Sequence, residues 1–453
     1  MSGLDLQSTP FAREIAAVTG SKTQTPCRCY DLEFLVKGES YKPLAIMGVN
    51  NINDFIDAFY RVYAFQFKTT AAIREVLIKN NASIEAVLKV YEIGRNTTYS
   101  ATALKNPKIR RFKAKLYLEE SDYITQNNPA VNDEAYLNDK SLVDVKVQLV
   151  EKGFEQLKSR HVGGTYSNIS GYNLLRHLVD YHANLDNDDV NSLINGVDIA
   201  PNYSTEVKSQ IAIEQGTNLI EAMHLVNNDG GGLWATGFSY YIHNQTWYIF
   251  PPFSLKRFND NVKRLIIVNL PKDRVPGLEV TYHDSESLLT ILSTRDVTVQ
   301  DKREARKLSF GTGLRFADAA RLLNGFAETI DNKLKVDASK NVNDLIVSKR
   351  GEDVQQIRFA QNKLTSAKNI ELSKLAPSKG FMMRISWENS DDSLIYPGMP
   401  VKVLYLKKKK PMTVIGTVVN VESSDYPAEQ SFPPKKFSQL SYIQVFVGDL
   451  DQD

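Results

Sequence analysis

Residues 233–252 read LWATGFSYYIHNQTWYIFPP and contain the clearest fold signal in the chain. Two segments rich in aromatic and β-branched side chains flank residues 243–245, and the pair Pro251-Pro252 ends the second segment. This arrangement predicts a β-hairpin and favours a β-rich protein. The alternating positions predict that Trp234 and Trp247 pack in a core, and the alternative is that they form an aromatic platform for a sugar ligand.

Other strands are predicted on both sides of this hairpin. Residues 143–150 alternate apolar side chains with polar ones, which indicates a strand with one buried and one wet face. Further strands are predicted at residues 30–36, 87–93, 112–118, 265–270, 278–282, 381–387, 401–406, 413–421 and 442–447, with the two that follow the hairpin continuing its sheet. Apolar side chains at helical spacing predict amphipathic helices at 52–63, 172–181 and 219–225. The expected fold class is therefore α+β, β-rich and multidomain, with short helices and a small C-terminal β-barrel.

The length of 453 residues predicts roughly two to four domains. We expect an N-terminal arm at 1–29, a β-rich domain at 30–150, a helical connector at 151–204, a second β-rich domain with the aromatic hairpin at 205–300, a polar, partly helical or mobile segment at 301–380, and a small barrel at 381–453. The arm has few apolar anchors, so it either reaches a neighbour or frays. A long polar loop is expected at 422–439.

The charge balance excludes one class of partner. The 55 basic and 53 acidic residues leave a net charge of +2, so no chain-wide field would hold nucleic acid or an anionic membrane. Residues 1–20 lack the basic start and apolar middle of a secretory signal, and no apolar run approaches the roughly 20 residues of a membrane helix. Cys27 and Cys29 are too close for an easy disulfide. We expect a soluble protein that is made without export and binds neither membrane nor nucleic acid directly.

Motifs that carry chemistry are incomplete in this sequence. The six histidines do not form the paired helical pattern of a zinc site, and the acidic cluster 186–189 lacks the glycine and the closing glutamate of a calcium loop. The glycines at 230–232 and 311–313 are not followed by the Lys and Ser/Thr of a phosphate loop, and no Gly-x-Ser-x-Gly turn occurs. We therefore expect no catalytic site, cofactor or metal.

One basic run is a candidate for interaction. Lys407, Lys408, Lys409 and Lys410 stand together at the predicted tip of a hairpin. Such a run could meet an acidic partner surface or nucleic acid, and the alternative is an ordinary solvated turn.

Three stretches together resemble the tail hub and baseplate proteins of bacteriophages. They are Gly164-Thr165-Tyr166-Ser167-Asn168 before a helix, the aromatic hairpin ending in Pro251-Pro252, and Trp387 followed by Tyr396-Pro397-Gly398-Met399-Pro400. The resemblance covers about half of the chain. It implies two tube-like β-barrel domains per chain, at about 30–150 and 205–300, so that a homotrimer presents six similar faces to a sixfold tail tube. It also implies other tail and baseplate proteins as partners, and a place in the virion after synthesis in the host cytoplasm.

Two other functions stay open at this point. A tail-associated enzyme that degrades cell wall or glycan would need a carboxylate pair near Trp234 or Trp247, and clearing of cell-wall material in a gel would reveal it. A receptor-binding or carbohydrate-binding module would give a signal on a glycan array.

Overall fold

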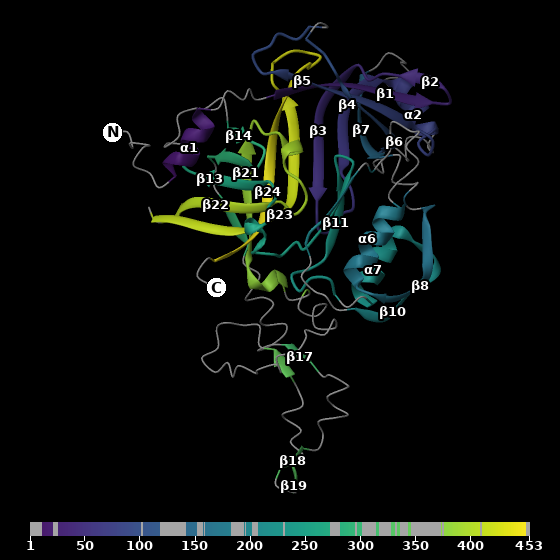
Figure 1. Ribbon diagram of the computed structural model, residues 1–453. Coiled ribbons are helices and arrows are strands. Elements are labelled where there is room, and N and C mark those ends of the chain that lie inside the picture. The colour runs from purple at the N-terminus through teal and green to yellow at the C-terminus, as the bar shows by residue number, and fades with distance from the viewer. Residues whose placement is uncertain are drawn as a thin grey trace, which may run out of the picture.

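The computed structural model describes residues 11–20, 26–100, 103–117, 142–151, 157, 159–182, 194, 196–201, 207–229, 232–271, 281–294, 297–300, 373, 376–407 and 410–449, with four short strands between 314 and 345. Most of the described strand residues belong to one branched sheet of fifteen strands (Figure 1). The observed fold is α+β and β-rich, as expected, and the sheet forms two barrels that share strands.

The helices are α1 (Ala12–Thr19), α2 (Ala71–Lys79), α6 (Gly171–His182) and α7 (Leu219–Asp229), with 3-10 turns η2 (Arg257–Asn259), η4 (Ala376–Lys379) and η5 (Asp392–Leu394). The first group of strands is β1 (Pro26–Val36), β2 (Glu39–Tyr41), β3 (Ala45–Asp54), β4 (Val62–Thr70), β5 (Glu85–Gly94), β6 (Lys108–Leu116) and β7 (Leu142–Glu151). The middle group is β8 (His161–Ile169), β9 (Gly196–Ile199), β10 (Lys208–Asn218), β11 (Ser239–His243), β12 (Thr246–Phe250), β13 (Arg264–Asn269), β14 (Tyr282–Asp284) and β15 (Leu288–Ser293). The last group is β16 (Thr298–Gln300), β17 (Leu314–Phe316), β18 (Glu328–Ile330), β19 (Lys333–Lys335), β20 (Asn343–Leu345), β21 (Phe381–Glu388), β22 (Pro400–Lys407), β23 (Lys410–Pro427) and β24 (Phe437–Asp449).

Barrel 1 is a closed circuit of backbone pairing. Its order is β23-β3-β4-β7-β6-β5-β1-β24, and β24 pairs back to β23. All these pairs are antiparallel, so side chains alternate between the interior and the outside along each strand. The interior is filled by large apolar side chains, among them Phe34, Phe65, Phe67 and Phe112, and α2 adds Leu77 to the same core.

Barrel 2 uses the other edges of the same two strands. From β23 the order is β22-β13-β15, and from β24 it continues to β21. In the described part of the chain β15 and β21 share no backbone ladder. Side chains connect this edge instead: Ser293 Oγ at the end of β15 donates to the Ser386 carbonyl at 2.7 Å, and Thr281 Oγ1, just before the neighbouring strand β14, donates to the Glu388 carbonyl at 2.9 Å. The second circuit is therefore closed by hydroxyl groups.

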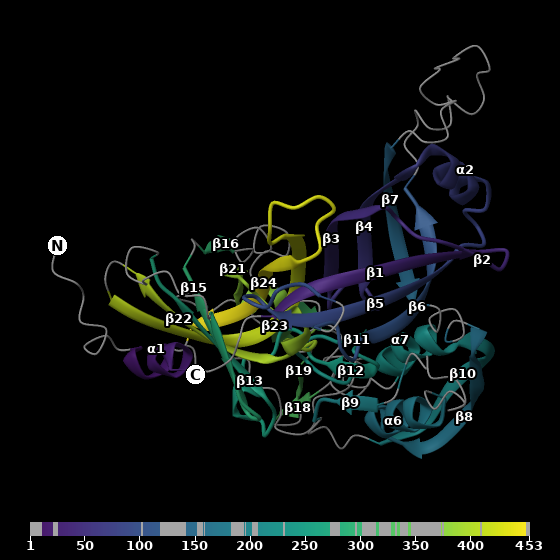
Figure 2. The same cartoon turned by 90° about the horizontal axis from the view of Figure 1, so that it is seen from above.

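The long strands β23 and β24 hold the two barrels together (Figure 2). The first half of β23 pairs with β22 and the second half pairs with β3, while β24 follows it along most of its length. The change of partner coincides with a register shift between Val418 and Asn420, as expected for a β-bulge that bends a strand. Gly416 lies beside β24, where a Cβ atom would stand 1.7 Å from the Phe446 carbonyl oxygen. This position has room only for glycine.

The middle of the chain forms a separate lobe beside the barrels (Figure 1). It contains the ribbon β8–β10 with α6 and α7, and a small sheet in which β12 pairs with β11 and β9. The aromatic hairpin is confirmed, with its turn at Asn244 and Gln245 in left-handed backbone conformation. The expectation that residues 265–270 continue its sheet is wrong, because β13 pairs with β15 and β22 instead.

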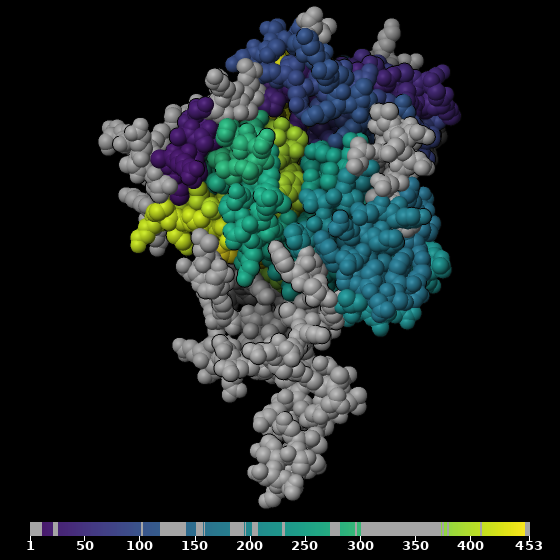
Figure 3. All heavy atoms as spheres, in the orientation of Figure 1, coloured from purple at the N-terminus to yellow at the C-terminus, as the bar shows by residue number. Residues whose placement is uncertain are grey.

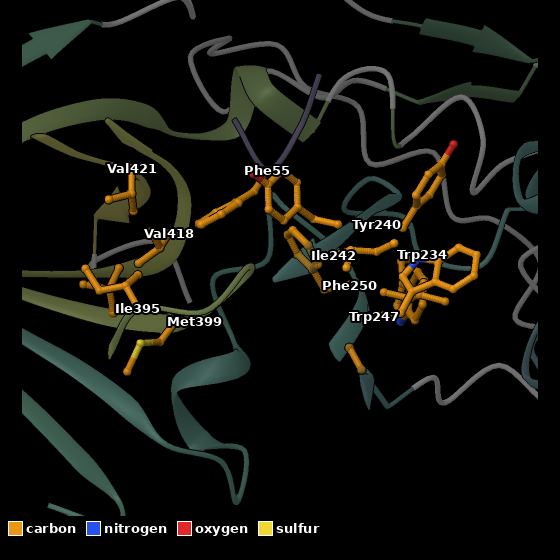
Figure 4. Packing of buried hydrophobic residues seen from close by; sticks show 14 of the residues in the cluster. Phe55, Trp234, Tyr240, Ile242, Trp247, Phe250, Ile395, Met399, Val418 and Val421 are labelled. Atoms are coloured by element: carbon orange, nitrogen blue, oxygen red, sulfur yellow. The ribbon is translucent and has the colours of Figure 1, made fainter. Parts of the chain in front are cut away.

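The hairpin and barrel 2 share one continuous apolar core. Phe55 stands between them, in edge contact with Tyr241, and the cluster continues to Ile395, Met399, Val418 and Val421 (Figure 4). Trp247 and Tyr241 are fully buried in it. The lobe and barrel 2 are thus packed as one body.

Three local expectations need correction. The helix expected at 52–63 is wrong: β3 ends at Asp54 and β4 begins at Val62, because Phe55 and Tyr63 fill different cores and pairing with neighbouring strands decides the backbone. The polar loop expected at 422–439 is shorter, since β23 runs to Pro427 and β24 begins at Phe437.

The arm expected at 1–29 contains structure in its described residues. Helix α1 packs on the outside of barrel 2, and residues 26–29 already belong to β1. Cys27 and Cys29 are buried and free, not exposed at a terminus, and burial together with Cys27 raises the pKa of Cys29 to about 11. Strands from 26–151 and from 381–449 pair in one sheet, so hydrogen bonding crosses the expected domain boundaries.

Candidate functional site: a buried ionic network between the barrels

Five charged side chains are buried where barrel 1, barrel 2 and the hairpin meet. They are Arg28 on β1, Arg61 before β4, Asp391 and Asp392 after β21, and Asp425 on β23, and none is more than 8% exposed. Removing charges from water is costly unless partners replace the water. The network therefore has to be judged by how completely its members are paired.

Asp392 is the centre of the network. Arg28 donates to Oδ1 at 2.9 Å, Arg61 donates to Oδ2, and Ser423 Oγ donates to Oδ2 at 3.1 Å. Burial alone would raise the pKa of Asp392, but Arg61 and Arg28 hold it well below its ordinary range. The ionised carboxylate thus joins β1, β4 and β23.

Asp391 orients the chain segment that carries Asp392. Its Oδ1 accepts a hydrogen bond from Arg28 at 2.8 Å and another from the backbone N–H of Ser393 at 3.1 Å. The second bond caps the short turn η5. The Asp392 backbone N–H also donates to Gln439 Oε1 at 2.8 Å, so the segment is fixed to β24 as well.

Asp425 completes the network from barrel 1. Tyr30 donates its hydroxyl to Oδ2, and Gln439 Nε2 donates to Oδ1 at 2.8 Å. Burial raises the pKa of Asp425 and Arg28 opposes the rise, while burial and then Asp425 raise the pKa of Tyr30 well above its ordinary value. Burial and ion pairing thus shift the pKa values of Asp425 and Asp392 in opposite directions.

The network extends to the aromatic hairpin through an asparagine. Arg61 Nε donates to Asn53 Oδ1 at 2.9 Å, and the same oxygen accepts from the Tyr241 hydroxyl at 3.2 Å. His243 at the end of β11 is buried nearby, and burial with the charge of Arg61 lowers its pKa to about 3. Because these groups satisfy one another away from solvent, their arrangement fixes relative positions and offers no group to a substrate.

The sequence prediction missed this network for an identifiable reason. On each of the two strands, two buried polar residues lie two positions apart and so point to the same side of the strand. They are Ser423 and Asp425 on β23, and Gln439 and Ser441 on β24. Polar residues in a stretch with prolines and lysines are typical of a loop, so the local composition predicts a loop at 422–439. The alternation at 423, 425, 439 and 441 is the signal that indicates strands.

The two predicted interaction tryptophans both lie in the core. Trp247 is 0% exposed, and Trp234 is 8% exposed with its Nε1 donating to the Pro201 carbonyl at 3.0 Å. Trp234 stacks against Phe238, and Trp247 packs edge-on against Phe59. A sugar platform needs an open ring face, which this packing does not leave on either residue.

The lysine run stands at the tip of the β22–β23 hairpin. Lys407 pairs with Lys410 across the hairpin and both side chains are exposed, while Lys408 and Lys409 lie outside the described residues. Pairing of β22 with β13 ends at Tyr405, so the tip extends past its neighbour on that side. The tip stays a candidate for an acidic partner.

The described residues form neither a metal-binding cluster nor a membrane-spanning helix. No three His, Cys, Asp or Glu side chains among them are grouped to hold a metal ion. No described helix combines the length and the apolar character that crossing a membrane requires. The acidic cluster 186–189 lies outside the described residues.

Comparison with known proteins gives solved structures only. Neither a protein-family model nor a curated protein sequence matches the chain. A tail protein from Neisseria meningitidis MC58 is similar at 8% identity and a TM-score of 0.43, over 92% of this chain and 96% of that one. The 43 kDa tail protein of prophage MuSo2 from Shewanella oneidensis is similar at 10% identity and a TM-score of 0.45, over 92% and 98%.

A third similar structure comes from a secretion system. It is an E. coli component of the type VI secretion system, at 10% identity and a TM-score of 0.36, over 91% of this chain and 76% of that one. The three similar structures are thus two tail proteins and one component of a secretion system.

Proposed function

We propose that this chain is a non-enzymatic structural protein of a bacteriophage tail or a related tail-like machine, and that it forms the hub of the baseplate as a homotrimer. The observation that carries the proposal is the pair of barrels that share β23 and β24 within one chain. Three copies would present six barrels, which suits a ring that meets a sixfold tube. The partners would be the tail tube above and the central spike below.

The buried ionic network supports this role. A symmetry adaptor needs its two barrels at one fixed spacing and angle, because each barrel must meet an equivalent site on the neighbouring ring. Arg28 and Asp392 join strand β1 of barrel 1 to the segment that leads into strand β22 of barrel 2. Buried polar pairs of this kind contribute specificity of arrangement more than stability.

The oligomeric state tests the proposal directly. Light scattering after size-exclusion chromatography should give a mass near three times the 51.0 kDa chain for the protein alone. If the trimer forms only with the tail proteins made from neighbouring genes, the complex should contain three copies of this chain. Electron microscopy of the tail should place the chain in the baseplate ring. A chain that stays monomeric with those neighbours, and is missing from purified tails, would refute the hub assignment.

A further inference from the structure

An aromatic ring on barrel 2 positions two cations, Arg264 and Lys402, which form the cation pair. Arg264 begins β13, Lys402 lies on β22, and both contact the ring of Phe258 in the turn η2. Arg264 Cζ is 5.4 Å and Lys402 Nζ is 4.6 Å from the centre of that ring. A contact between a cation and a ring face orients the cation and leaves its charge in place.

The cation pair lies on the outer surface of barrel 2. Strands β13 and β22 are parallel neighbours, and Lys402 stands opposite Ile266 in their register. Ile266 and Leu404 belong to the outer apolar cluster that α1 covers. Arg264 and Lys402 come two positions before these residues, so alternation places them on the same outer side. Both cations and Phe258 are partly exposed, so a ligand can reach them from solvent.

The carboxylates of the neighbouring segments do not neutralise the cation pair. Asp260 is paired with Arg257 at 3.5 Å, and Asp284 is paired with Lys263 at 2.5 Å. Glu286 is exposed in the turn between β14 and β15 and pairs with neither cation. Among the described residues, no carboxylate lies within ion-pair distance of the cation pair. The ring is thus the partner that positions both charges.

This arrangement favours the binding of an anion. The two positive charges contact one ring, so they are at most about 10 Å apart and repel each other. Arg264 Nε is enclosed and makes no hydrogen bond to a described residue, which shows that the guanidinium lies against the protein surface. Lys256, two residues before Phe258, is exposed and adds a third cation to this region. A bound anion would relieve the repulsion among these groups.

The surroundings favour carboxylates over a nucleic acid. Asp260 and Asp284 belong to the neighbouring segments, and their negative charges would repel a phosphate backbone that runs across the region. One or two carboxylates could bind the cation pair without meeting these charges. The ring of Phe258 also offers an apolar surface to the methylene groups of a glutamate. The net charge of +2 adds no long-range attraction for a polyanion.

We propose that the cation pair and Phe258 form a binding site for one or two carboxylates in an acidic segment of another protein. Phe258 is the positioning residue, and Arg264 and Lys402 contact the carboxylates. This inference concerns the outer surface of barrel 2 and does not depend on the proposed hub function.

Zero-length coupling of a carboxylate peptide to lysines in the natural chain tests the site. The probe is N-acetylated tetraglutamate, and mass spectrometry measures its yield on each lysine. Each yield is divided by the yield of the same lysine with acetic anhydride, so that differences in exposure cancel. The normalised yield at Lys402 should exceed that at Lys42, which already pairs with Asp31, about fivefold. The Lys108–Glu92 pair, at 2.7 Å, is the positive control for the coupling reagent.

Three variants separate the contributions to the site. Arg264→Gln keeps Lys402 and should lower its normalised yield about fivefold, because one charge of the pair is lost. Phe258→Leu keeps both charges and should lower the yield about twofold, because the ring no longer orients them. Arg176→Gln removes one exposed positive charge from the lobe and should leave the yield unchanged. Melting temperatures show that the variants are folded.

Two results would overturn the binding site. One is an equal normalised yield at Lys402 and Lys42 in the natural chain while the Lys108–Glu92 control reacts. The other is an unchanged yield at Lys402 in a folded Arg264→Gln variant. Competition identifies the class of ligand: if duplex DNA protects Lys402 at a lower concentration of charge than free tetraglutamate does, the assignment to an acidic protein segment is wrong.

Discussion

The outer faces of the two barrels differ in a way that follows from how their strands pair. Barrel 1 is antiparallel, and its strands β6 and β7 alternate an apolar inner side with a largely polar outer side. In barrel 2, β13 pairs parallel with both β15 and β22, and the four central residues of β13, Leu265 to Val268, are apolar and buried on both sides. Parallel strands of this type need cover on both faces.

Helix α1 supplies the outer cover of barrel 2. Its Phe11, Ile15 and Val18 are at most 3% exposed and pack on Ile266, Val268, Leu270, Leu292 and Leu404. Figure 3 shows the purple atoms of this N-terminal segment lying against green atoms of the chain that forms this barrel. The N-terminal segment is therefore part of the apolar packing on the outside of barrel 2, whereas the outside of barrel 1 is polar.

Breaking the buried ionic network between the barrels should have the largest effect on the free energy of unfolding. Arg28→Ala leaves Asp391 without a guanidinium and leaves Asp392 with that of Arg61 alone, and removing one partner of a buried pair costs about 3–5 kcal/mol of unfolding free energy. Urea denaturation measures it. Arg384→Ala is the matched control, because its pair with Glu422 is nearly half exposed and should cost under about 1 kcal/mol. Equal losses for the two variants would contradict the assigned role.

The cover of barrel 2 gives the next largest effect. Ile15→Ala removes a buried side chain of α1 and should cost about 2–4 kcal/mol, measured by urea denaturation. Ile52→Ala on the outside of barrel 1 is the control, since that side chain is 52% exposed and its loss should change stability by less than about 0.5 kcal/mol. If Ile15→Ala is as mild as the control, α1 does not stabilise barrel 2.

Acid should lower the free energy of unfolding through His243, which is buried beside the ionic network. Its folded pKa of about 3 lies below the unfolded value of about 6.5, so the unfolded chain binds the proton first and stability falls as pH drops from about 6.5 towards 3. The slope from this group is at most about 1.4 kcal/mol per pH unit. Asp392 lowers the free energy of unfolding only at more acidic pH. Its folded pKa is depressed, so the unfolded chain binds the proton first once the pH falls below the unfolded pKa of about 3.9.

Denaturation at several pH values separates these two groups. His243→Gln should flatten the stability curve between pH of about 6 and about 4 and leave the steeper fall below that range. An identical pH dependence in the variant would show that His243 is not the responsible group.

The smallest effect is expected where side chains close barrel 2. Ser293→Ala removes the hydroxyl that bonds the Ser386 carbonyl and should cost about 1 kcal/mol. Amide hydrogen exchange should show faster opening of β15 and β21, with barrel 1 unchanged. Equal protection of β15 and β21 in the variant would mean that other contacts close the barrel.

Local sequence patterns predicted the parts in which each segment carries its own signal. The hairpin at 239–250, the helices α6 and α7, and the strands β5, β6, β7 and β13 follow from alternation or helical spacing in a few adjacent residues. The helix predicted at 52–63 is wrong because the apolar spacing fits a helix, while the two ends of the segment pair with β23 and β7, which come from elsewhere in the chain. The candidate site failed for a related reason, since Arg28 and Asp392 are 364 residues apart.

The sequence by itself therefore determined that the protein is β-rich, where its aromatic hairpin lies, and that no complete catalytic motif is present. Only the tertiary structure decided that β23 and β24 serve two barrels, that α1 covers the second barrel, and that Asp392 is buried between two arginines. The physical reason is that alternation reports whether a residue is buried but not against which strand. Strand pairing and charge pairing join residues hundreds of positions apart, and no local pattern specifies the partner.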